Sequence, residues 1–438
     1  MGNLRRLTDV SERVVNSKTG IIQRCYELTP QADAPQFFHY YAHTSNCEAF
    51  SDNENFRNTG GVATTRKLAM AKAIGESIER YSSALFDQQA LPLESFRNGK
   101  LNKISPDFFN YFSEEQFNNP DFPYAKFTQD TLVRWSPTIN LSTFEEIHVP
   151  ASAIWMPYFY DSESGELPIM QPISTGLSAH CSLVEATLGG LLEVVERDSF
   201  SLTWQGCLSH PKIIIETLSD ANYELVQRIE AAGHEVHLLN ATTELGIPVI
   251  LGVAFHERYP SPPFVVSAAA ELNPEVAVRK ALEELVHTRR YMREVQEFDE
   301  VFNVNEEWDK VAEQIHHLRL WGDRAMLPKA QFLTRSEKRI SFDSLPNLEQ
   351  STETKSLKHL VELLKNAGYQ ALAADLTTPD VASMGFRVVR ALIPGLHPFF
   401  IGHRLRARNH PRLFEVPQKL GFPAIQPGAD NPIPHPFP

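Results

Sequence analysis

The sequence predicts one large α+β domain, α/β-like in its strand-rich parts, made of two related halves. Two stretches share one outline of helix, Ala-Gly stop, strand, Thr-Thr turn and second strand: "RIEAAGHEVHLLNATTELGIPVILGVAF" and "LLKNAGYQALAADLTTPDVASMGFRVVRALIPG". Gly233 and Gly368 are separated by 135 positions, and so are the threonine pairs 242–243 and 377–378. A glycine commonly ends a helix, and apolar runs after it suit buried strands, so each half is expected to contain a helix–strand–strand unit.

A second feature also occurs twice. "AIGESIERYSS" (73–83) and "GLLEVVERDSF" (190–200) both carry Glu-x-x-Glu-Arg on a segment that is otherwise largely apolar. Residues three apart are neighbours on a helix, so each pair of glutamates is expected to lie on one helical face. The repeat therefore supports two related halves with a similar acidic helix in each.

The elements are expected in the following order. Residues 1–60 mix short strands and loops, and a glycine turn at 58–67 leads into a helix over 68–86. The polar segment 87–130 is expected to elaborate the surface. Alternating apolar residues then predict a hairpin whose turn lies at Leu141–Phe144, and a long helix follows over 183–204.

The last residues differ from the rest. We expect a folded domain over residues 1–410 and a proline-rich tail over 411–438, which ends "DNPIPHPFP". Proline at every second position forbids a helix and a paired central strand, which leaves a stiff extended conformation. Considered alone, such a tail also fits a disordered segment or an SH3-type ligand.

Composition narrows the class of protein. The chain has 438 residues, a net charge of −13 and a hydrophobic content of 42%. An acidic chain of this kind is not expected to bind nucleic acid or an anionic membrane, because both require a cationic surface. The four cysteines are scattered, no signal peptide is indicated, and no apolar run is long enough to cross a bilayer. We therefore expect a soluble cytoplasmic protein.

The acidic helices have two interpretations. Each could be a solvated face with weak ion pairs. If both face one cleft, however, their like charges would repel by roughly 3 kcal/mol per pair at an effective dielectric near 20, and cations would have to neutralise them. Magnesium is the natural cation, because it is usually held by a few carboxylates together with substrate phosphates. The arginines of the two motifs would then suit phosphate oxygens.

A third helix is expected to begin at Asn273 and Pro274, in "NPEVAVRKALEELVHTRRYM". It offers either Arg279 with Glu283 or Lys280 with Glu284, and the sequence alone does not fix this register. The usual nucleotide motifs, G-x-x-x-x-G-K-[ST] and G-x-G-x-x-G, are missing. "HEVH" at 234–237 lies on an expected strand, so a metalloprotease motif is not supported.

Together these motifs resemble the YcaO family. The resemblance rests on "KAIGESIERYS", "STGLSAHCSLVEATLGGLLEVVERDSF", "NPEVAVRKALEELVHTR" and the late "VVRALIPGL…RLFEVPQKLG", which occur in order from about Gly60 onwards. It implies a YcaO-type ATP-binding catalytic domain over residues 1–410, with Mg²⁺ held between glutamates of two helices. The residues implied to bind ATP are Glu76, Glu79, Arg80, Glu185, Glu193, Glu196, Arg197, Arg279, Glu283 and, in the other register, Glu284. The implied metal ligands are Glu76, Glu79, Glu193 and Glu196.

Two positions depart from the family pattern, and the tail indicates a subclass. Lys72 stands where the first motif commonly has Ser, and Gly189 stands where the second often has Asn, Gln or His. The ending Pro434-x-Pro436-x-Pro438 is similar to that of azoline-forming cyclodehydratases. In that subclass the tail reaches the active site, which would make these prolines and the terminal carboxylate part of the catalytic apparatus.

The resemblance implies an ATP-dependent cyclodehydratase that converts Cys, Ser or Thr of a ribosomally made precursor peptide into thiazoline or oxazoline. The catalytic motifs begin early, so we expect no fused leader-binding domain and a separate leader-binding partner. A homodimer and a flavin-dependent azoline dehydrogenase partner are also expected. Alternatives are backbone thioamide or amidine formation, a non-catalytic ATP-binding scaffold in a peptide-modification complex, and an accessory role in ribosomal-protein modification.

Overall fold

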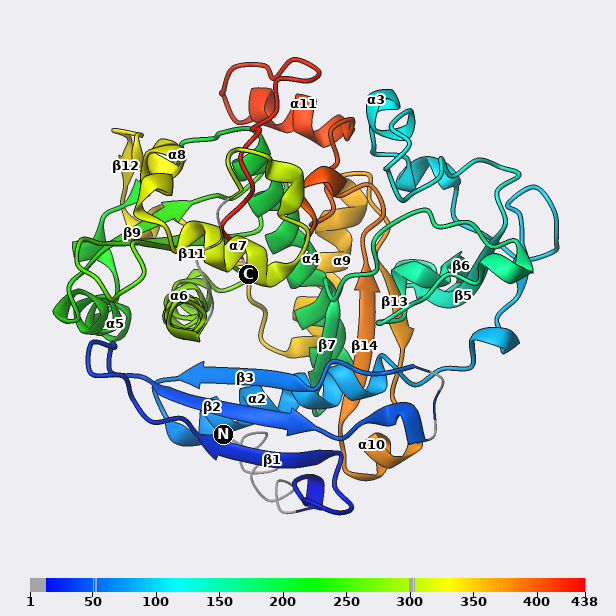
Figure 1. Ribbon diagram of the computed structural model, residues 1–438, viewed down its shortest axis with the longest axis horizontal. Coiled ribbons are helices and arrows are strands. Elements are labelled where there is room, and N and C mark those ends of the chain that lie inside the picture. The colour runs from blue at the N-terminus through cyan, green and yellow to red at the C-terminus, as the bar shows by residue number, and fades with distance from the viewer. Residues whose placement is uncertain (1–12, 50, 52, 299–301, 303, 438) are drawn as a thin grey trace.

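The computed structural model describes residues 13–437 except 50, 52, 299–301 and 303. Its strands form a small three-stranded sheet and two larger sheets, which helices join and cover (Figure 1). None of the helices in this described part of the chain combines the length and the apolar run that a membrane crossing needs. The architecture therefore mixes helices and sheets in one domain, as the sequence predicts.

The small sheet carries the first acidic helix. Strands β1 (Ile22–Glu27), β2 (Phe38–Thr44) and β3 (Asn58–Ala63) pair in sequence order, and helix α2 (Arg66–Ser82) packs on them. The apolar side of α2, which includes Ile74 and Ile78, is fully buried. The opposite side of α2 is thus left facing the rest of the molecule.

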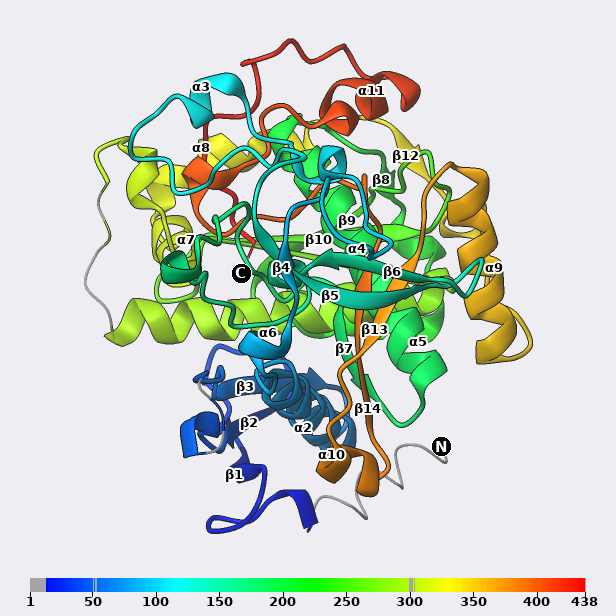
Figure 2. The same cartoon turned by 90° about the vertical axis from the view of Figure 1, so that its right-hand side faces the viewer.

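The second sheet has the order β11-β10-β9-β8-β12. Strands β10 and β11 are buried along nearly their whole length, and the long helix α6 (Pro274–Phe298) packs on both. Figure 2 shows α6 crossing the molecule between the α2 layer and the larger part of the fold. The members of this layer are β8 (Lys212–Ile213), α5 (Asp220–Ala231), β9 (His234–Asn240), β10 (Val249–His256), β11 (Phe264–Ala270) and β12 (Arg339–Ile340).

The third sheet has the order β4-β5-β13-β14-β7, and β6 pairs with β5. Helix α4 (Leu183–Gln205) contacts β14 and β7 of this sheet and also β11 and β10 of the second. Helix α4 is therefore the central element of the fold. The remaining members are β4 (Leu93–Glu94), β5 (Val133–Asn140), β6 (Glu146–Pro150), β7 (Leu177–His180), α9 (Glu353–Asn366), β13 (Leu372–Asp375) and β14 (Arg387–Leu392).

The predicted internal repeat is confirmed. Helices α5 and α9 are both followed by a glycine with positive φ, +89° at Gly233 and +88° at Gly368, and then by two antiparallel strands. The turns between the strands also match. The hydroxyl of Thr242 accepts from the N–H of Val249 (3.2 Å), as the hydroxyl of Thr377 accepts from the N–H of Val388 (2.9 Å). One local hydrogen-bond scheme thus builds both units.

Other predicted elements are also present with small shifts. The helix expected at 68–86 spans 66–82, the helix expected at 183–204 spans 183–205, and β5 and β6 form the expected hairpin. The short helices are α3 (Glu114–Phe117), α7 (Gln314–Trp321), α8 (Leu327–Ala330) and α10 (Pro379–Ser383).

The segment 411–438 is not extended throughout. It begins with helix α11 (Pro411–Lys419), in which Pro411 occupies the first turn, where no intrahelical N–H is needed. Residues 431–437 have no helix or strand, as their alternating prolines require. This last stretch is buried except at Pro432, and in Figure 1 the red part of the tail runs from α11 toward the middle of the molecule.

Candidate ATP and magnesium site

The first half of the candidate site lies on α2. Thr65 caps the helix by accepting from the N–H of Leu68 (3.4 Å), and the face opposite the small sheet carries the Glu-x-x-Glu-Arg motif. The N–H of Gly60, in β3, donates to Oε2 of Glu76 (3.1 Å). Arg80 forms ion pairs with Glu79 (3.0 Å) and Glu76 (3.3 Å).

Helix α4 repeats this arrangement. The N–H of Gly176, just before β7, donates to Oε2 of Glu193 (3.3 Å). Arg197 forms ion pairs with Glu196 (3.0 Å) and Glu193 (3.5 Å). In both halves a glycine N–H from a neighbouring strand or its lead-in fixes the first glutamate, and the following arginine joins both carboxylates. The two motifs are thus equivalent in contacts as well as in sequence, and both are mostly buried rather than fully solvated.

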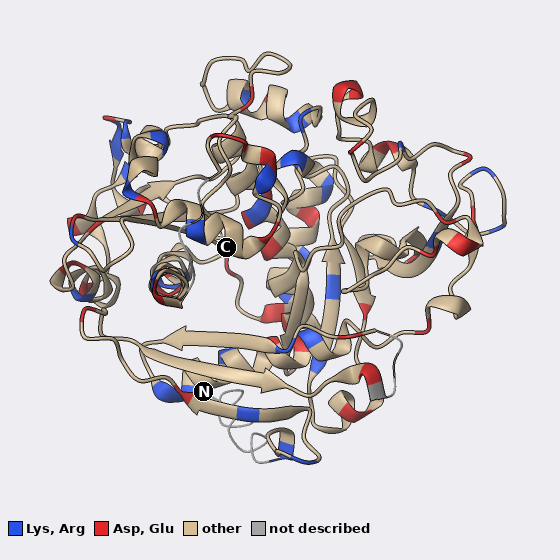
Figure 3. Ribbon diagram, viewed as in Figure 1, with Lys and Arg blue, Asp and Glu red and all other residues tan. Residues whose placement is uncertain are grey.

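The two half-sites face each other. The charge of Glu193 acts on both Glu79 and Arg80, so the carboxylates of α2 and α4 share one electrostatic environment. Figure 3 shows red and blue segments on α4 and on α2 beneath it. Burial, together with the neighbouring charges of Glu193 and Glu76, raises the pKa of Glu79 to about 8 despite Arg80. Burial likewise raises the pKa of Glu196 to about 7.

Helix α6 supplies the third side. Lys280 and Glu284 are the pair directed at α4, because both interact electrostatically with Glu196. Arg279 is exposed, and Glu283 is buried against a different partner, Lys72 (2.8 Å). The structure therefore brings Lys280 and Glu284 toward Glu196 of α4 and places Glu283 against Lys72 of α2, whereas Arg279 lies at the surface.

Glu284 is held ionised within this group. Burial opposes its charge, but His287, whose Nδ1 lies 3.6 Å from the carboxylate, and the charges of Lys72 and Arg197 lower its pKa to about 2. The charge of Glu76 also raises the pKa of His287. The ring of His287 lies close to the backbone of β3, because a Cβ added at Gly60 would lie 2.6 Å from its Nε2. His287 is thus a member of the site that the sequence analysis missed, although it stands on the expected face of a helix already singled out.

Arg390 was also missed. It lies on β14, almost completely buried, where its Nε donates to the carbonyl of Ala153 (2.8 Å) while its Nη1 has no hydrogen-bond partner. Burial lowers its pKa to about 10, and it lies within electrostatic range of Glu193 and Glu79. Arg390 stands in an otherwise apolar strand, so the sequence offers only one indication of a role, namely that it lies within the family-like stretch "VVRALIPG".

The two departures from the family pattern have structural partners. Lys72 bridges from α2 to α6 by pairing with Glu283 and, at 3.9 Å, with Glu284. A Cβ at Gly189 would lie 2.9 Å from the hydroxyl oxygen of Ser178, so this glycine lets α4 approach β7 closely. Glu185 lies in the first turn of α4, where it pairs with His180 (2.9 Å) and accepts from Ser182 (2.7 Å).

The donor set suits magnesium and phosphate. Carboxylate oxygens are the hard ligands that Mg²⁺ takes, and arginines fit phosphate oxygens. Among the residues that the structure describes, no group of three or more His, Cys, Asp or Glu side chains surrounds a single metal position. The glutamates of each half are joined to Arg80 or Arg197 instead. The chemistry of these residues therefore fits Mg²⁺ and a phosphate group.

The tail lies at one end of this site. The ring centroid of Phe437 lies 4.6 Å from the guanidinium carbon of Arg197. Pro434 and Pro436 are buried in the same stretch, and Pro438 lies outside the described residues. The structure thus places Pro434 and Pro436 in the chain segment that meets the second motif.

Comparison with known proteins identifies the class. The sequence model of the YcaO family, described as a cyclodehydratase that binds ATP and Mg²⁺, matches residues 60–397. The chain therefore belongs to the YcaO family, an ATP- and Mg²⁺-binding family of cyclodehydratases.

Its relatives include a protein of unknown role. An uncharacterized protein of Methanothermobacter thermautotrophicus is 26% identical over 372 residues, which cover 79% of this chain and 85% of the relative. The Escherichia coli ribosomal protein S12 methylthiotransferase accessory factor YcaO is 26% identical over 214 residues, which cover 45% of this chain and 35% of the relative.

Solved structures show the same fold. A heterocyclase in complex with substrate and cofactor has a TM-score of 0.81 and 22% identity, and the match covers 99% of this chain and 57% of that one. The heterocyclase TruD has a TM-score of 0.68 and 25% identity, with 84% and 50% covered. YcaO from Methanopyrus kandleri, bound with AMPPCP and Mg²⁺, has a TM-score of 0.64 and 21% identity, with 90% and 89% covered. This chain thus spans about half the length of the two heterocyclase chains.

Proposed function

We propose that this protein is an ATP-dependent cyclodehydratase that converts Cys, Ser or Thr residues of a ribosomally made precursor peptide into thiazolines or oxazolines. The observation that carries the proposal is the contact of the proline-rich tail with Arg197, at the edge of two facing Glu-x-x-Glu-Arg helices. That contact joins the candidate nucleotide site to the segment that resembles the tail of azoline-forming enzymes. The backbone thioamide- and amidine-forming activities are less favoured, because a proline-rich tail is not expected of enzymes with those activities.

The residues of the two Glu-x-x-Glu-Arg motifs would bind the metal ion and the nucleotide. Glu76, Glu79, Glu193 and Glu196 would hold Mg²⁺, and Arg80 and Arg197 would hold phosphate oxygens. Bound ATP would supply a γ-phosphoryl group, which turns the oxygen of the attacked amide into a leaving group.

Ring closure would remove the oxygen of the attacked amide as phosphate. The Cys, Ser or Thr side chain forms a bond from sulfur or oxygen to the preceding carbonyl carbon, and its proton passes to solvent. The carbonyl oxygen becomes an oxyanion, accepts the phosphoryl group and leaves as phosphate, while the amide nitrogen loses its proton to give the C=N bond. The net change is loss of one water from the peptide and hydrolysis of one ATP to ADP and phosphate. The arginines of the two motifs would stabilise the negative charge that develops.

Partners belong to the same proposal. The McbBCD microcin synthetase of Escherichia coli, a complex that shares this fold at a TM-score of 0.58, has also been solved with pro-MccB17 bound. By analogy we propose that a separate partner presents the leader of the precursor peptide, that two copies of this chain associate, and that a flavin-dependent dehydrogenase oxidises the azolines. The location would be the cytoplasm, where precursor peptides are made.

The first test is calorimetric titration with ATP, with and without Mg²⁺, of the wild type and of Glu193→Gln. We expect Mg²⁺-dependent binding that Glu193→Gln weakens at least roughly tenfold, because the substitution removes one charged ligand. Glu224→Gln is the matched control, since Glu224 also pairs with an arginine four residues later (2.7 Å) but on the exposed face of α5.

Turnover separates the alternatives. With the precursor and its partner, mass spectrometry should detect one water lost per ring. ATP binding by the folded protein without any such loss would favour the non-catalytic scaffold, and a sulfur-for-oxygen exchange would favour the thioamide activity. Wild-type protein that binds no ATP, with or without the partner, would contradict the proposal.

A further inference from the structure

The proline-rich tail is buried to an unusual degree. Of residues 431–437, only Pro432 is exposed, and His435 is 1% exposed. A buried backbone must satisfy its N–H and C=O groups, but this segment forms no helix or strand that could do so. Its polar groups must therefore be met by side chains or by the backbone of other segments.

Side chains do meet three successive carbonyls. The indole N–H of Trp204 donates to the carbonyl of Ile433 (2.8 Å), and the indole N–H of Trp321 donates to the carbonyl of Pro434 (3.0 Å). Nδ1 of His317 lies 2.6 Å from the next carbonyl, that of His435. An indole can only donate, so the first two contacts have a fixed direction.

The prolines reduce the number of buried backbone N–H groups that need an acceptor. Pro434 and Pro436 have no N–H, so at these positions the buried tail has no donor to satisfy. The N–H of Ile433 donates locally to Oδ1 of Asn431 (3.1 Å). Alternating proline therefore suits surroundings that offer hydrogen-bond donors, and the tail and the side chains around it are complementary in hydrogen bonding.

Helix α4 sets the direction of the tail. Trp204 lies seven residues after Arg197, two turns along the helix and about 10.5 Å away. Ile433, held by Trp204, and Phe437, over Arg197, are separated by four residues, which span about 12 Å in a polyproline conformation. Phe200 lies between the two ends, with its ring 4.4 Å from that of Phe437. The tail thus runs back along α4 from Trp204 to Arg197.

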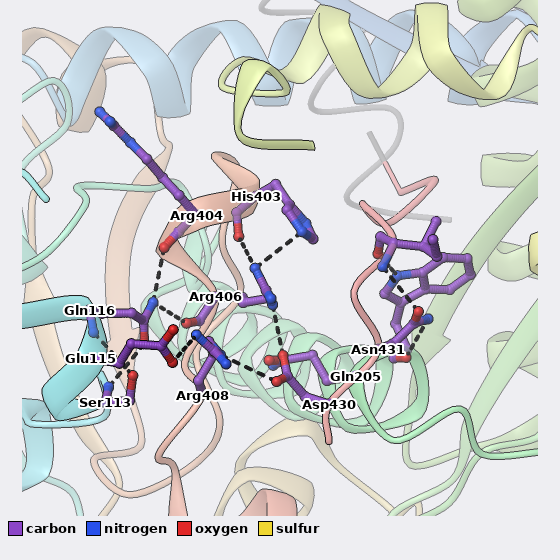
Figure 4. Close-up of polar contacts among 12 residues, drawn as sticks. Ser113, Glu115, Gln116, Gln205, His403, Arg404, Arg406, Arg408, Asp430 and Asn431 are labelled. Carbon is purple, nitrogen blue, oxygen red and sulfur yellow. Dashed lines mark hydrogen bonds and ion pairs between the residues drawn. The ribbon is translucent and has the colours of Figure 1, made fainter. Parts of the chain in front are cut away.

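A second anchor fixes the start of the tail. Figure 4 shows Asp430 between two arginines, and its carboxylate accepts from Arg406 (2.7 Å) and Arg408 (3.3 Å). The next residue, Asn431, donates from its N–H to the carbonyl of Gln205 (2.8 Å), at the end of α4. The tail is therefore tied to α4 on both sides of its exposed Pro432.

We propose that Trp204 and Trp321 are positioning residues, whose indole N–H groups hold the carbonyls of Ile433 and Pro434 and thereby set the end of the tail against Arg197. This inference rests on the proposed function for its catalytic consequence. The placement itself rests only on the contacts above. The two indoles also support each other, with ring centroids 5.3 Å apart in an edge-to-face arrangement.

Hydrogen–deuterium exchange of the full chain tests the placement. In Trp321→Phe, which keeps a ring but removes the donor, we expect the amides of Ile433, His435 and Phe437 to exchange roughly tenfold faster than in the wild type. The matched control is Trp135→Phe, because Trp135 is equally buried and donates to the carbonyl of Glu94 (2.8 Å), far from the tail in sequence. Unchanged tail exchange in folded Trp321→Phe would overturn the inference, and so would an equal rise in Trp135→Phe. Trp204→Phe provides a second variant if Trp321→Phe does not fold.

Turnover tests the consequence. If the indole acts through the tail, Trp321→Phe and deletion of residues 436–438 should each lower kcat with little change in the KM for ATP, and the double variant should be no worse than the deletion alone. Trp135→Phe should combine additively with the deletion. If the losses of kcat in Trp321→Phe and in the deletion add up in the double variant, Trp321 has only a structural role, and the inference is overturned. If the protein proves to have no cyclodehydratase activity, the exchange experiment still decides whether the indoles hold the tail.

Discussion

The ring of Phe437 lies over the guanidinium of Arg197, 4.6 Å from ring centroid to guanidinium carbon, and thereby joins the end of the chain to the second acidic motif. Phe399 lies near the same guanidinium at 5.3 Å. Arg197 thus contacts both the carboxylates of its own motif and two aromatic rings. Any change in the tail is expected to reach the candidate ATP site through this side chain.

Replacing Phe437 should therefore affect both stability and the nucleotide site. In Phe437→Leu the desolvated cation–π contact is lost, which should cost about 1–2 kcal/mol of unfolding free energy and weaken Mg²⁺–ATP binding. Urea denaturation and calorimetry measure the two effects. Phe302→Leu removes a similar contact, with Arg319 at 5.2 Å, and should leave ATP binding unchanged. Equal ATP affinity in wild type and Phe437→Leu would disprove the link.

Lys72 should be a strong contributor to stability. It neutralises Glu283, whose side chain is 1% exposed, so Lys72→Met leaves a buried carboxylate without its partner and should lower the unfolding free energy by about 3–5 kcal/mol. Denaturant unfolding checks this value. The double variant Lys72→Met with Glu283→Gln should recover most of the loss. Arg66→Met is the control, because its exposed pair with Glu27 should be worth less than about 1 kcal/mol.

Gly176 is expected to be required for the nucleotide site. Its φ of +89° disfavours other residues, and a Cβ there would lie 2.2 Å from the carbonyl oxygen of Ala391. Gly176→Ala should displace the N–H that holds Glu193 and weaken Mg²⁺–ATP binding at least roughly tenfold by calorimetry. Gly246→Ala has a similar φ of +71° but open space around it, so it reports the backbone strain alone. Similar ATP affinities in the two variants would contradict the role of Gly176.

Acid should destabilise the protein steeply. Burial lowers the pKa of several histidines from 6.5 to about 3 or 4, namely His39, His210, His234, His317 and His397. At these five positions the unfolded chain binds more protons than the folded one, so the stability that they contribute is complete above about pH 6.5 and falls as the pH drops toward 4. Glu79 and Glu196, whose pKa values are raised, act in the opposite direction but are fewer. Each histidine contributes about 1.4 kcal/mol per pH unit in that window. Urea midpoints measured from about pH 7.5 to 5 should fall accordingly, and constant midpoints would contradict the burial of these rings.

His210→Gln should reduce this pH dependence by about one proton, since it removes one buried base. His43→Gln, at a partly exposed position, serves as the control.

Features with a local signal could be predicted from the sequence. The glycine stops at 233 and 368 and the threonine turns after them depend on residues close in the chain, and both repeats formed as expected. The facing of the two acidic helices was one of two open interpretations. Residue spacing shows which side chains share a helical face but not what that face meets.

The remainder depended on long-range packing. The two registers of the third motif differ by one residue, which turns the pair by about 100° around α6. Only the position of α6 in the fold brings Lys280 and Glu284 within electrostatic range of Glu196 on α4. Arg390 gave no periodic signal because it stands in a buried strand. The indoles that hold the tail lie 229 and 113 residues from the carbonyls they meet, a distance that no local pattern bridges.

The pairing of indoles with a proline run also has an evolutionary consequence. A buried proline of the tail replaced by another residue would bring a buried N–H next to indole donors, and an indole replaced by phenylalanine would leave a buried carbonyl without that donor. Either change alone is costly, so positions 204 and 321 should vary together with the terminal prolines across relatives. Related sequences that lack the alternating terminal prolines should also lack both tryptophans.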